Sequence, residues 1–108
     1  MELSVLSNIL LELKSESMKV SLNPSKYNLK SLMNKYDMLF LGKDFNCIYT
    51  NELTRAINNI FNIPVTEEEV NAHIPIVCQA LHMSYEAMIG VSDISKPNPK
   101  LACYMVTL

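Results

Sequence analysis

Apolar side chains recur every three or four residues in four segments of the chain, which is the spacing of helices that bury one face. The pattern predicts helices over residues 3–18, 25–37, 50–61 and 66–81. The stripe of the first helix that is expected to face the core consists of Leu3, Leu6, Leu10 and Leu13. Pro24 interrupts the chain before the second helix, and Ser25 is expected to cap that helix.

The fourth helix has the clearest start signal in the chain. Thr66 is expected to accept a hydrogen bond from the amide of Glu69 while the Glu69 carboxylate reaches back to the Thr66 amide, as in a capping box. Pro75 lacks an amide hydrogen and clashes with the preceding turn, so a kink or a restart of the helix is expected there. The third helix is expected to be capped by Thr50 or Asn51.

Short apolar runs outside the helical segments predict strands. The runs 38–41 and 45–49 are separated by three residues that include Gly42, which is typical of a β-hairpin. Residues 101–107 form a last apolar run and are expected to join the hairpin as a third strand.

The predicted elements define an α+β fold that is mainly helical. We expect four to five helices and a small antiparallel sheet made of a hairpin, about 38–49, and the C-terminal strand. Residues 1–108 are enough for one core and are expected to form a single domain. A winged-helix-like arrangement is compatible with this order, with residues 92–100 as the wing.

The segment 76–90 resembles part of a known family. Ala80 and Leu81 end a predicted helix, and Ser84 is expected to cap a further short helical turn through Met88. This segment resembles the last two helices of phage-repressor-type helix-turn-helix domains, and the resemblance implies a regulator. The Ser- and Gln-rich pair of helices with which that family reads DNA has no counterpart upstream in this chain.

Charge is distributed unevenly along the chain, although the net charge is only −2. None of the nine Lys and Arg residues lies between Ala56 and Ser95. Five of the eleven acids lie there, namely Glu67, Glu68, Glu69, Glu86 and Asp93. Because phosphate binding needs cations, the predicted helix over 66–81 is poorly suited to nucleic acid.

The composition favours a cytoplasmic protein. No segment approaches the roughly 20 apolar residues of a membrane-spanning helix, and Glu2 stands where a signal peptide would be basic. Cys47, Cys78 and Cys103 are odd in number and widely spaced, unlike a secreted disulfide framework. We therefore expect reduced thiols and no membrane partner. The abundance of Asn, Ile and Lys favours an AT-rich bacterial or phage genome.

No group of residues supplies a complete catalytic or metal-binding set. Cys78 and His82 lie four residues apart on a predicted helix, as two zinc ligands or a thiolate and its base would, but the further ligands or the orienting group are missing. His73 is expected to satisfy a backbone carbonyl near Asn71 that Pro75 frees, or to lie exposed. We expect no cofactor, no metal and no enzymatic activity.

Two functions remain open, and the first is protein binding. The acidic second half and the seven Met residues favour a non-enzymatic regulatory or inhibitory module that binds another protein or a second copy of itself. Capping of the fourth helix and filling of the core are the structural alternatives for these residues. The candidate contact residues are Glu67, Glu68, Met83, Tyr85 and Glu86.

The second function is a small DNA-binding transcriptional regulator of winged-helix or repressor-like type. Nucleic acid is a partner only in this alternative, which uses basic residues of the first half and of the predicted wing. The candidates are Lys26, Tyr27, Lys30, Arg55, Lys96 and Lys100. Six acids in Met1 to Arg55 offset its seven basic residues, so a solvated face of mixed charge competes with this interpretation.

Overall fold

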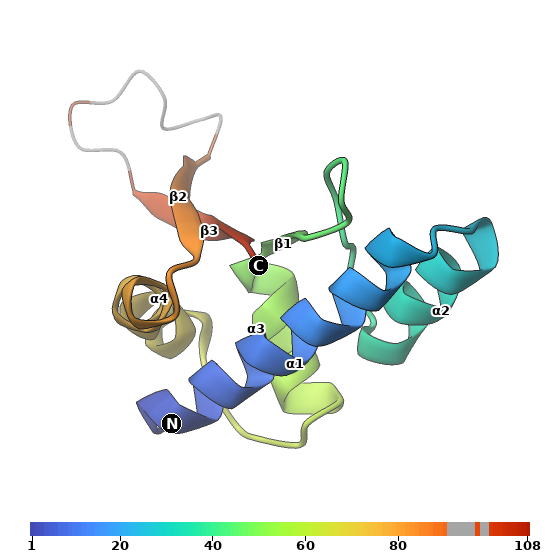
Figure 1. Cartoon of the computed structure of the whole chain (residues 1–108). Helices are drawn as coiled ribbons and strands as arrows, with labels where there is room; N and C mark the ends of the chain where they lie inside the picture. The colour runs from blue at the N-terminus through green and yellow to red at the C-terminus, as the bar shows by residue number, and fades with distance from the viewer. Residues whose placement is uncertain (91–96, 98–99) are drawn as a thin grey trace.

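Four helices and a three-stranded antiparallel sheet make up the part of the chain that the computed structural model describes, which is residues 1–90, 97 and 100–108 (Figure 1). The elements in chain order are α1 (Leu3–Leu22), α2 (Lys26–Tyr36), β1 (Cys47–Tyr49), α3 (Thr50–Asn59), α4 (Glu67–Leu81), β2 (Ser84–Ile89) and β3 (Leu101–Thr107). The expected α+β, mainly helical fold is confirmed.

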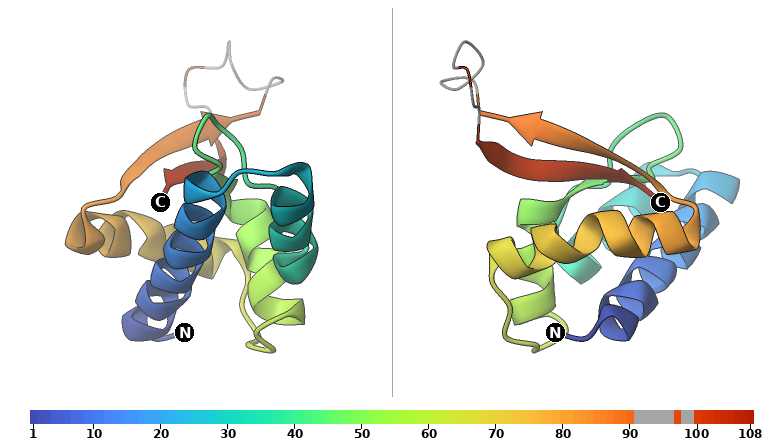
Figure 2. Two further views of the ribbon diagram at one scale, coloured as in Figure 1. Left: turned by 45° about the vertical axis from the view of Figure 1, so that its right-hand side comes forward. Right: turned by 90° about the vertical axis from the view of Figure 1, so that its left-hand side faces the viewer.

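The C-terminal strand lies in the middle of the sheet. The strand order is β1-β3-β2, and Val106 of β3 is paired with Ile48 on one side and with Tyr85 on the other. Figure 2 shows the sheet lying over one side of the helices. Val106 and Ile48 are fully buried, so this face of the sheet closes the helical core.

The predicted hairpin over 38–49 is reduced to one bridge. Leu41 and Cys47 exchange two backbone hydrogen bonds of 2.8 and 2.9 Å around a turn in which Gly42 has a φ of +88°. Residues 38–40 form no ladder, because Met38 and Phe40 instead bury their side chains in the core. The strand that fills the second edge of the sheet is β2.

The expectation of a helical turn over 84–88 was wrong. These residues are paired with β3 from Ser84, opposite Thr107, to Met88, opposite Cys103. Ser84 can cap a helix, but the cross-strand ladder gives the backbone of this segment its hydrogen bonds instead. The resemblance of residues 76–90 to a repressor-type helix pair therefore fails at its second helix.

The helices follow the sequence signals closely, with differences at their ends. The Ser25 hydroxyl accepts from the amide of Asn28 at 3.0 Å and caps α2 as expected. In α1 the helix continues four residues past the predicted end to Leu22, and Leu3 is 41% exposed although it was expected in the buried stripe. Helix α4 runs through Pro75 without restarting.

The start of α3 also differs from the expectation. Tyr49 occupies the N-cap position without a side-chain hydrogen bond, and Thr50 is the first helical residue. Neither Thr50 nor Asn51 therefore caps the helix, and the Thr50 side chain is fully buried. The Thr50 hydroxyl has a different role, described below.

One hydrophobic core joins all the helices to the sheet. Tyr36 at the end of α2 stacks on Phe61 and tilts against Phe40, with ring centroids 6.1 Å apart in both pairs. Its hydroxyl donates to Glu12 of α1 at 2.9 Å. Burial, together with this carboxylate, raises the pKa of Tyr36 above its usual range, so the hydroxyl stays a donor.

The order of elements is compatible with the winged-helix-like arrangement considered from the sequence, but the wing predicted over residues 92–100 lies, apart from residues 97 and 100, outside the described residues. Helices α3 and α4 follow β1 and precede β2, and the last strand lies between the other two. Across the described residues, no helix has both the length and the apolar character needed to cross a membrane.

Candidate interaction surface on helix α4

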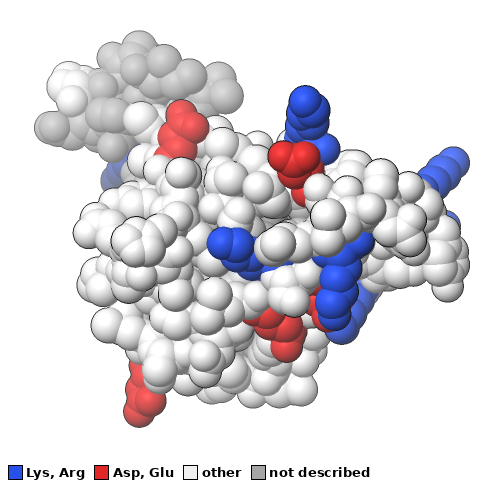
Figure 3. Space-filling model, in the orientation of Figure 1, with Lys and Arg blue, Asp and Glu red and all other residues white. Residues whose placement is uncertain are grey.

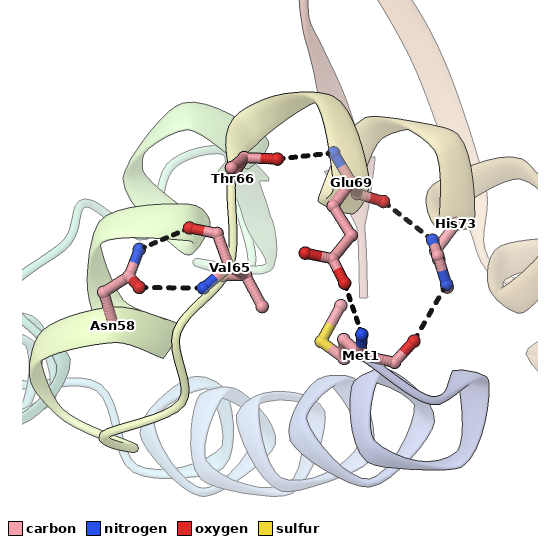
Figure 4. Close-up of polar contacts among 6 residues, drawn as sticks. All are labelled: Met1, Asn58, Val65, Thr66, Glu69 and His73. Atoms are coloured by element: carbon pink, nitrogen blue, oxygen red, sulfur yellow. Dashed lines mark hydrogen bonds and ion pairs between the residues drawn. The ribbon is translucent and has the colours of Figure 1, made fainter.

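The start of α4 is fixed by two side chains. The Thr66 hydroxyl accepts from the amide of Glu69 at 3.1 Å, which confirms Thr66 as the N-cap (Figure 4). In α3 the Asn58 amide binds both the N–H and the C=O of Val65, at 2.9 and 3.0 Å. The connection between α3 and α4 is therefore held on both sides, and the first turn of α4 has a defined direction.

The second half of the expected capping box does not form. The Glu69 carboxylate pairs with the amino group of Met1, and not with the Thr66 amide (Figure 4). This contact lowers the pKa of Glu69 below its usual value. His73 lies beside the pair, with Nδ1 2.7 Å from the carbonyl oxygen of Glu69 and Nε2 3.1 Å from that of Met1. His73 thus ties α4 to the start of α1, with Glu69 and not Asn71 supplying the helix carbonyl.

A buried polar link holds the middle of α4 against α3 and β3. The Thr50 hydroxyl donates to the side-chain oxygen of Asn71 at 2.8 Å and accepts from the amide of Tyr104 at 2.8 Å. Buried polar groups cost free energy unless they are paired, so this arrangement favours one orientation of α4. The opposite side of the helix is thereby turned outward.

The outward side of α4 is almost free of charge. Its exposed residues are Glu68, Ala72, Ile76, Gln79 and Ala80, and we call this set the α4 face. Ile76 is 56% exposed between the two alanines, while Glu67 and Glu68 lie exposed at the first turn. No Lys or Arg occurs in α4 or β2. The α4 face can therefore offer a partner an apolar contact with an acidic end.

The five residues predicted for protein binding are divided by the structure. Glu67, Glu68 and Glu86 are exposed. Met83 is buried in the core, so its side chain is not part of the surface. Tyr85 is half-buried, where it accepts a hydrogen bond from Gln79 at 2.9 Å and meets the ring of Tyr104 edge to face at 5.7 Å. Tyr85 thus helps to hold the β2–β3 hairpin on α4.

The outer side of the sheet carries half-exposed apolar side chains beside Glu86, a grouping that sequence reasoning missed. Cross-strand partners share a face, so Tyr49, Met105 and Glu86 lie in one row on the side opposite to Val106. Met88 and Cys103 form the next pair on this side. This grouping could have been predicted if residues 84–89 had been recognised as a strand, because the pairing of the strands fixes which face of the sheet each side chain is on.

The candidate nucleic-acid residues do not gather on one surface. Lys26, Tyr27 and Lys30 are exposed on α2, which packs against α1 at the end of the molecule away from α4 (Figure 1). In Figure 3 most of the blue side chains lie on this side, and hardly any lie over α4. Lys100 is exposed before β3, and Lys96 lies outside the described residues.

Arg55 is already engaged within the fold. It donates to the carbonyl oxygen of Asp37 at 2.6 Å and pairs with the Asp37 carboxylate at 3.4 Å. Asp37 is the C-cap residue of α2, with a φ of +50°. The guanidinium of Arg55 therefore binds the C-cap residue of α2, a contact that the sequence did not suggest.

The cysteines have the character of structural residues. Cys78 is fully buried, and burial raises the pKa of its thiol to about 11. His82, four residues after Cys78, lies exposed at the C-cap of α4 with a φ of +58°. Burial also raises the pKa of Cys103. Among the described residues, no group of three or more His, Cys, Asp or Glu side chains is placed to hold a metal ion.

No protein-family model, curated protein or solved structure matches this chain. The described residues form a small, mainly helical α+β domain, in which helix α4 is acidic at its start and has no Lys or Arg.

Proposed function

We propose that this protein is a non-enzymatic regulatory or inhibitory module that works by binding another protein through the α4 face. The observation that carries the proposal is Ile76, whose side chain is 56% exposed on a helix without Lys or Arg. Ala72 and Ala80 flank it on the same side, so a partner can approach the helix closely. Burying an apolar side chain of this size supplies about 1.5–3 kcal/mol toward association.

Charge specifies the chemistry of the partner. Glu67 and Glu68 lie exposed at the first turn of α4, and Glu86 is exposed on β2. A complementary partner presents Lys or Arg around an apolar pocket that accepts Ile76. Exposed charges of this kind steer the encounter and raise the association rate more than they slow dissociation.

DNA binding is the second candidate, and the order of elements favours it. The α3–α4 pair followed by a β-hairpin is an arrangement that DNA-binding domains use. Its phosphate contacts would come from Lys26 and Lys30 of α2 and from Lys100. The acidic start of α4 opposes insertion of that helix into a groove lined by phosphates.

Affinity capture from a lysate of the native host, with nuclease added, tests the proposal. The baits are the wild type, Ile76→Lys and the control Leu39→Lys, which changes a side chain that is 46% exposed in the segment between α2 and β1. We expect a protein that is retained by the wild type and the control and lost with Ile76→Lys. Equal retention by all three baits would refute the α4 face as the contact.

A charge-reversal series then separates the two candidates. For protein binding, Glu68→Lys with Glu86→Lys should lower the association rate of the captured partner, and Lys26→Glu with Lys30→Glu should have little effect. For DNA binding, the lysine changes should weaken duplex binding in a salt-dependent manner, and the glutamate changes should strengthen it. Binding measured at two salt concentrations decides between these opposite results.

A further inference from the structure

Helix α1 has a second apolar stripe, which adjoins its buried face along one flank of the helix. Its buried face is formed by Leu6, Ile9, Leu10, Leu13, Ser17 and Val20. Four further apolar side chains are exposed, namely Leu3 at 41%, Leu11 at 45%, Met18 at 52% and Leu22 at 83%. On the face of the molecule that α1 crosses, Figure 3 shows charged side chains mainly over the centre and the right half, and a largely uncharged surface between them and the left edge.

The spacing keeps this stripe on one side of a straight helix. From Leu3 the positions advance by 4, 4, 3, 4 and 4 residues, through Ser7, Leu11, Lys14 and Met18 to Leu22. An 11-residue period of this kind corresponds to about 3.67 residues per turn, close to the 3.6 of an α-helix. We call these six residues the outer stripe of α1.

The outer stripe is symmetric about its midpoint. Reversing its direction places Leu3 opposite Leu22, Ser7 opposite Met18, and Leu11 opposite Lys14, and the same three pairs occur again on the other half. The end pair joins two leucines, and the other two pairs join Met18 to a small serine and Leu11 to the flexible stem of Lys14, so the stripe can pack on itself in antiparallel orientation. Such self-complementarity is the requirement for a two-fold interface between identical chains.

We propose that the outer stripe of α1 is a self-association surface, on which a second copy of this chain packs its own α1 in antiparallel orientation. Leu3 contacts Leu22 of the second copy at both ends, and Met18 packs over Ser7, whose small side chain lets the helices approach. The stem of Lys14 covers Leu11 of the second copy, and its ammonium remains in solvent.

The available area agrees with a weak dimer. The exposed parts of the four apolar side chains amount to about 800 Å² when two copies are counted. Specific interfaces begin at about 1,200 Å² of total buried surface, and Ser7 and the stem of Lys14 bring the total closer to this value. A helix of 20 residues is about 30 Å long, which is enough for this contact. We therefore expect a weak dimer that forms only at high protein concentration. This inference is independent of the α4 face.

Sedimentation equilibrium of the full chain tests the proposal. From about 5 to about 500 μM, a range that brackets a weak dimer, the mean mass should rise from 12.2 kDa toward twice that value. Leu22→Lys and Leu3→Glu should each raise the dissociation constant about tenfold or more. The control Ile76→Lys, which changes a side chain on α4 that is 56% exposed, should leave the dissociation constant unchanged.

The double variant Leu3→Glu with Leu22→Lys tests the orientation. In the antiparallel pair each new carboxylate meets a new ammonium, so the dissociation constant should fall below that of either single variant, although exposed ion pairs do not replace the whole apolar contact. Both charges suit the helix ends at which they stand, so folding is retained and circular dichroism verifies it. A wild type that stays at 12.2 kDa throughout, a dimer lost only with Ile76→Lys, or a double variant without recovery would each overturn the proposal.

Discussion

The hydroxyl of Thr50 donates to the side-chain oxygen of Asn71 at 2.8 Å and so joins the first turn of α3 to the middle of α4. The same hydroxyl accepts from the amide of Tyr104, which brings the central strand into the link. Thr50 is fully buried, so loss of either hydrogen bond would leave a buried polar group without a partner, at a cost in the free energy of folding. This side chain is one of the contacts that fix the orientation of α4, and with it the outward side that carries Ile76.

Thr50→Val should lower the free energy of unfolding by about 1–3 kcal/mol, because it leaves both Asn71 and the Tyr104 amide without their partner. Urea unfolding with an unchanged m-value measures this loss. The control is Thr54→Val, since the buried Thr54 hydroxyl donates only to the Thr50 carbonyl within the same helix. An equal loss in both variants would mean that the cost is local to α3.

Thr66→Ala should lower the free energy of unfolding by about 1 kcal/mol, because it removes the acceptor for the Glu69 amide at the start of α4. The midpoint of urea unfolding measures the effect. Ser31→Ala, an exposed change inside α2, serves as the control and should shift the midpoint far less. A midpoint that does not move with Thr66→Ala would show that this cap adds nothing to stability.

The contact between Glu69 and the amino group of Met1 predicts a dependence of stability on pH. This contact lowers the pKa of Glu69 from its usual 4.5 in the folded state, so the contribution is complete above pH 4.5 and is lost as the pH falls through the folded pKa. The difference in stability between wild type and Glu69→Gln should shrink in acid. Glu68→Gln is the matched control, and a difference that is the same at pH 7 and pH 3 would contradict the assignment.

Cys78 should be the slowest of the three thiols to react with iodoacetamide in the folded protein. Its pKa of about 11 leaves on the order of 0.1% thiolate at pH 8, and the residue is fully buried. Cys47 and Cys103 are partly exposed and should be alkylated first. Peptide mass spectrometry with and without urea measures the rates, and early labelling of Cys78 without urea would disprove its burial.

Replacement of Cys47, Cys78 and Cys103 together by Ala or Ser should leave partner binding intact, because none of them lies on the α4 face. Packing around Cys78 should weaken, since a buried side chain loses volume or gains a hydroxyl. The capture experiment with Ile76→Lys as the negative control measures binding. Loss of the partner with the triple variant at a temperature where it remains folded would assign a functional role to a thiol.

The sequence by itself determined the helices and their caps. Thr66 and Ser25 act within three residues of their own positions, and the stripe of Leu6, Leu10 and Leu13 needs only helical geometry to face one side. Signals of this range are independent of the rest of the fold. The uneven charge is likewise a property of the sequence, and it places acids and no cations on α4 whatever the packing.

Only the tertiary structure decided the features that join distant segments. Ser84 and Glu69 each had a plausible local partner, yet the ladder with β3 made residues 84–89 a strand, and the amino group of Met1 took the Glu69 carboxylate. Leu3 and Ile76 are both large apolar residues, yet each is substantially exposed, because no described element covers its side of the helix. The physical reason is that a local pattern fixes which residues share a face, whereas the energy of distant contacts decides which face is buried.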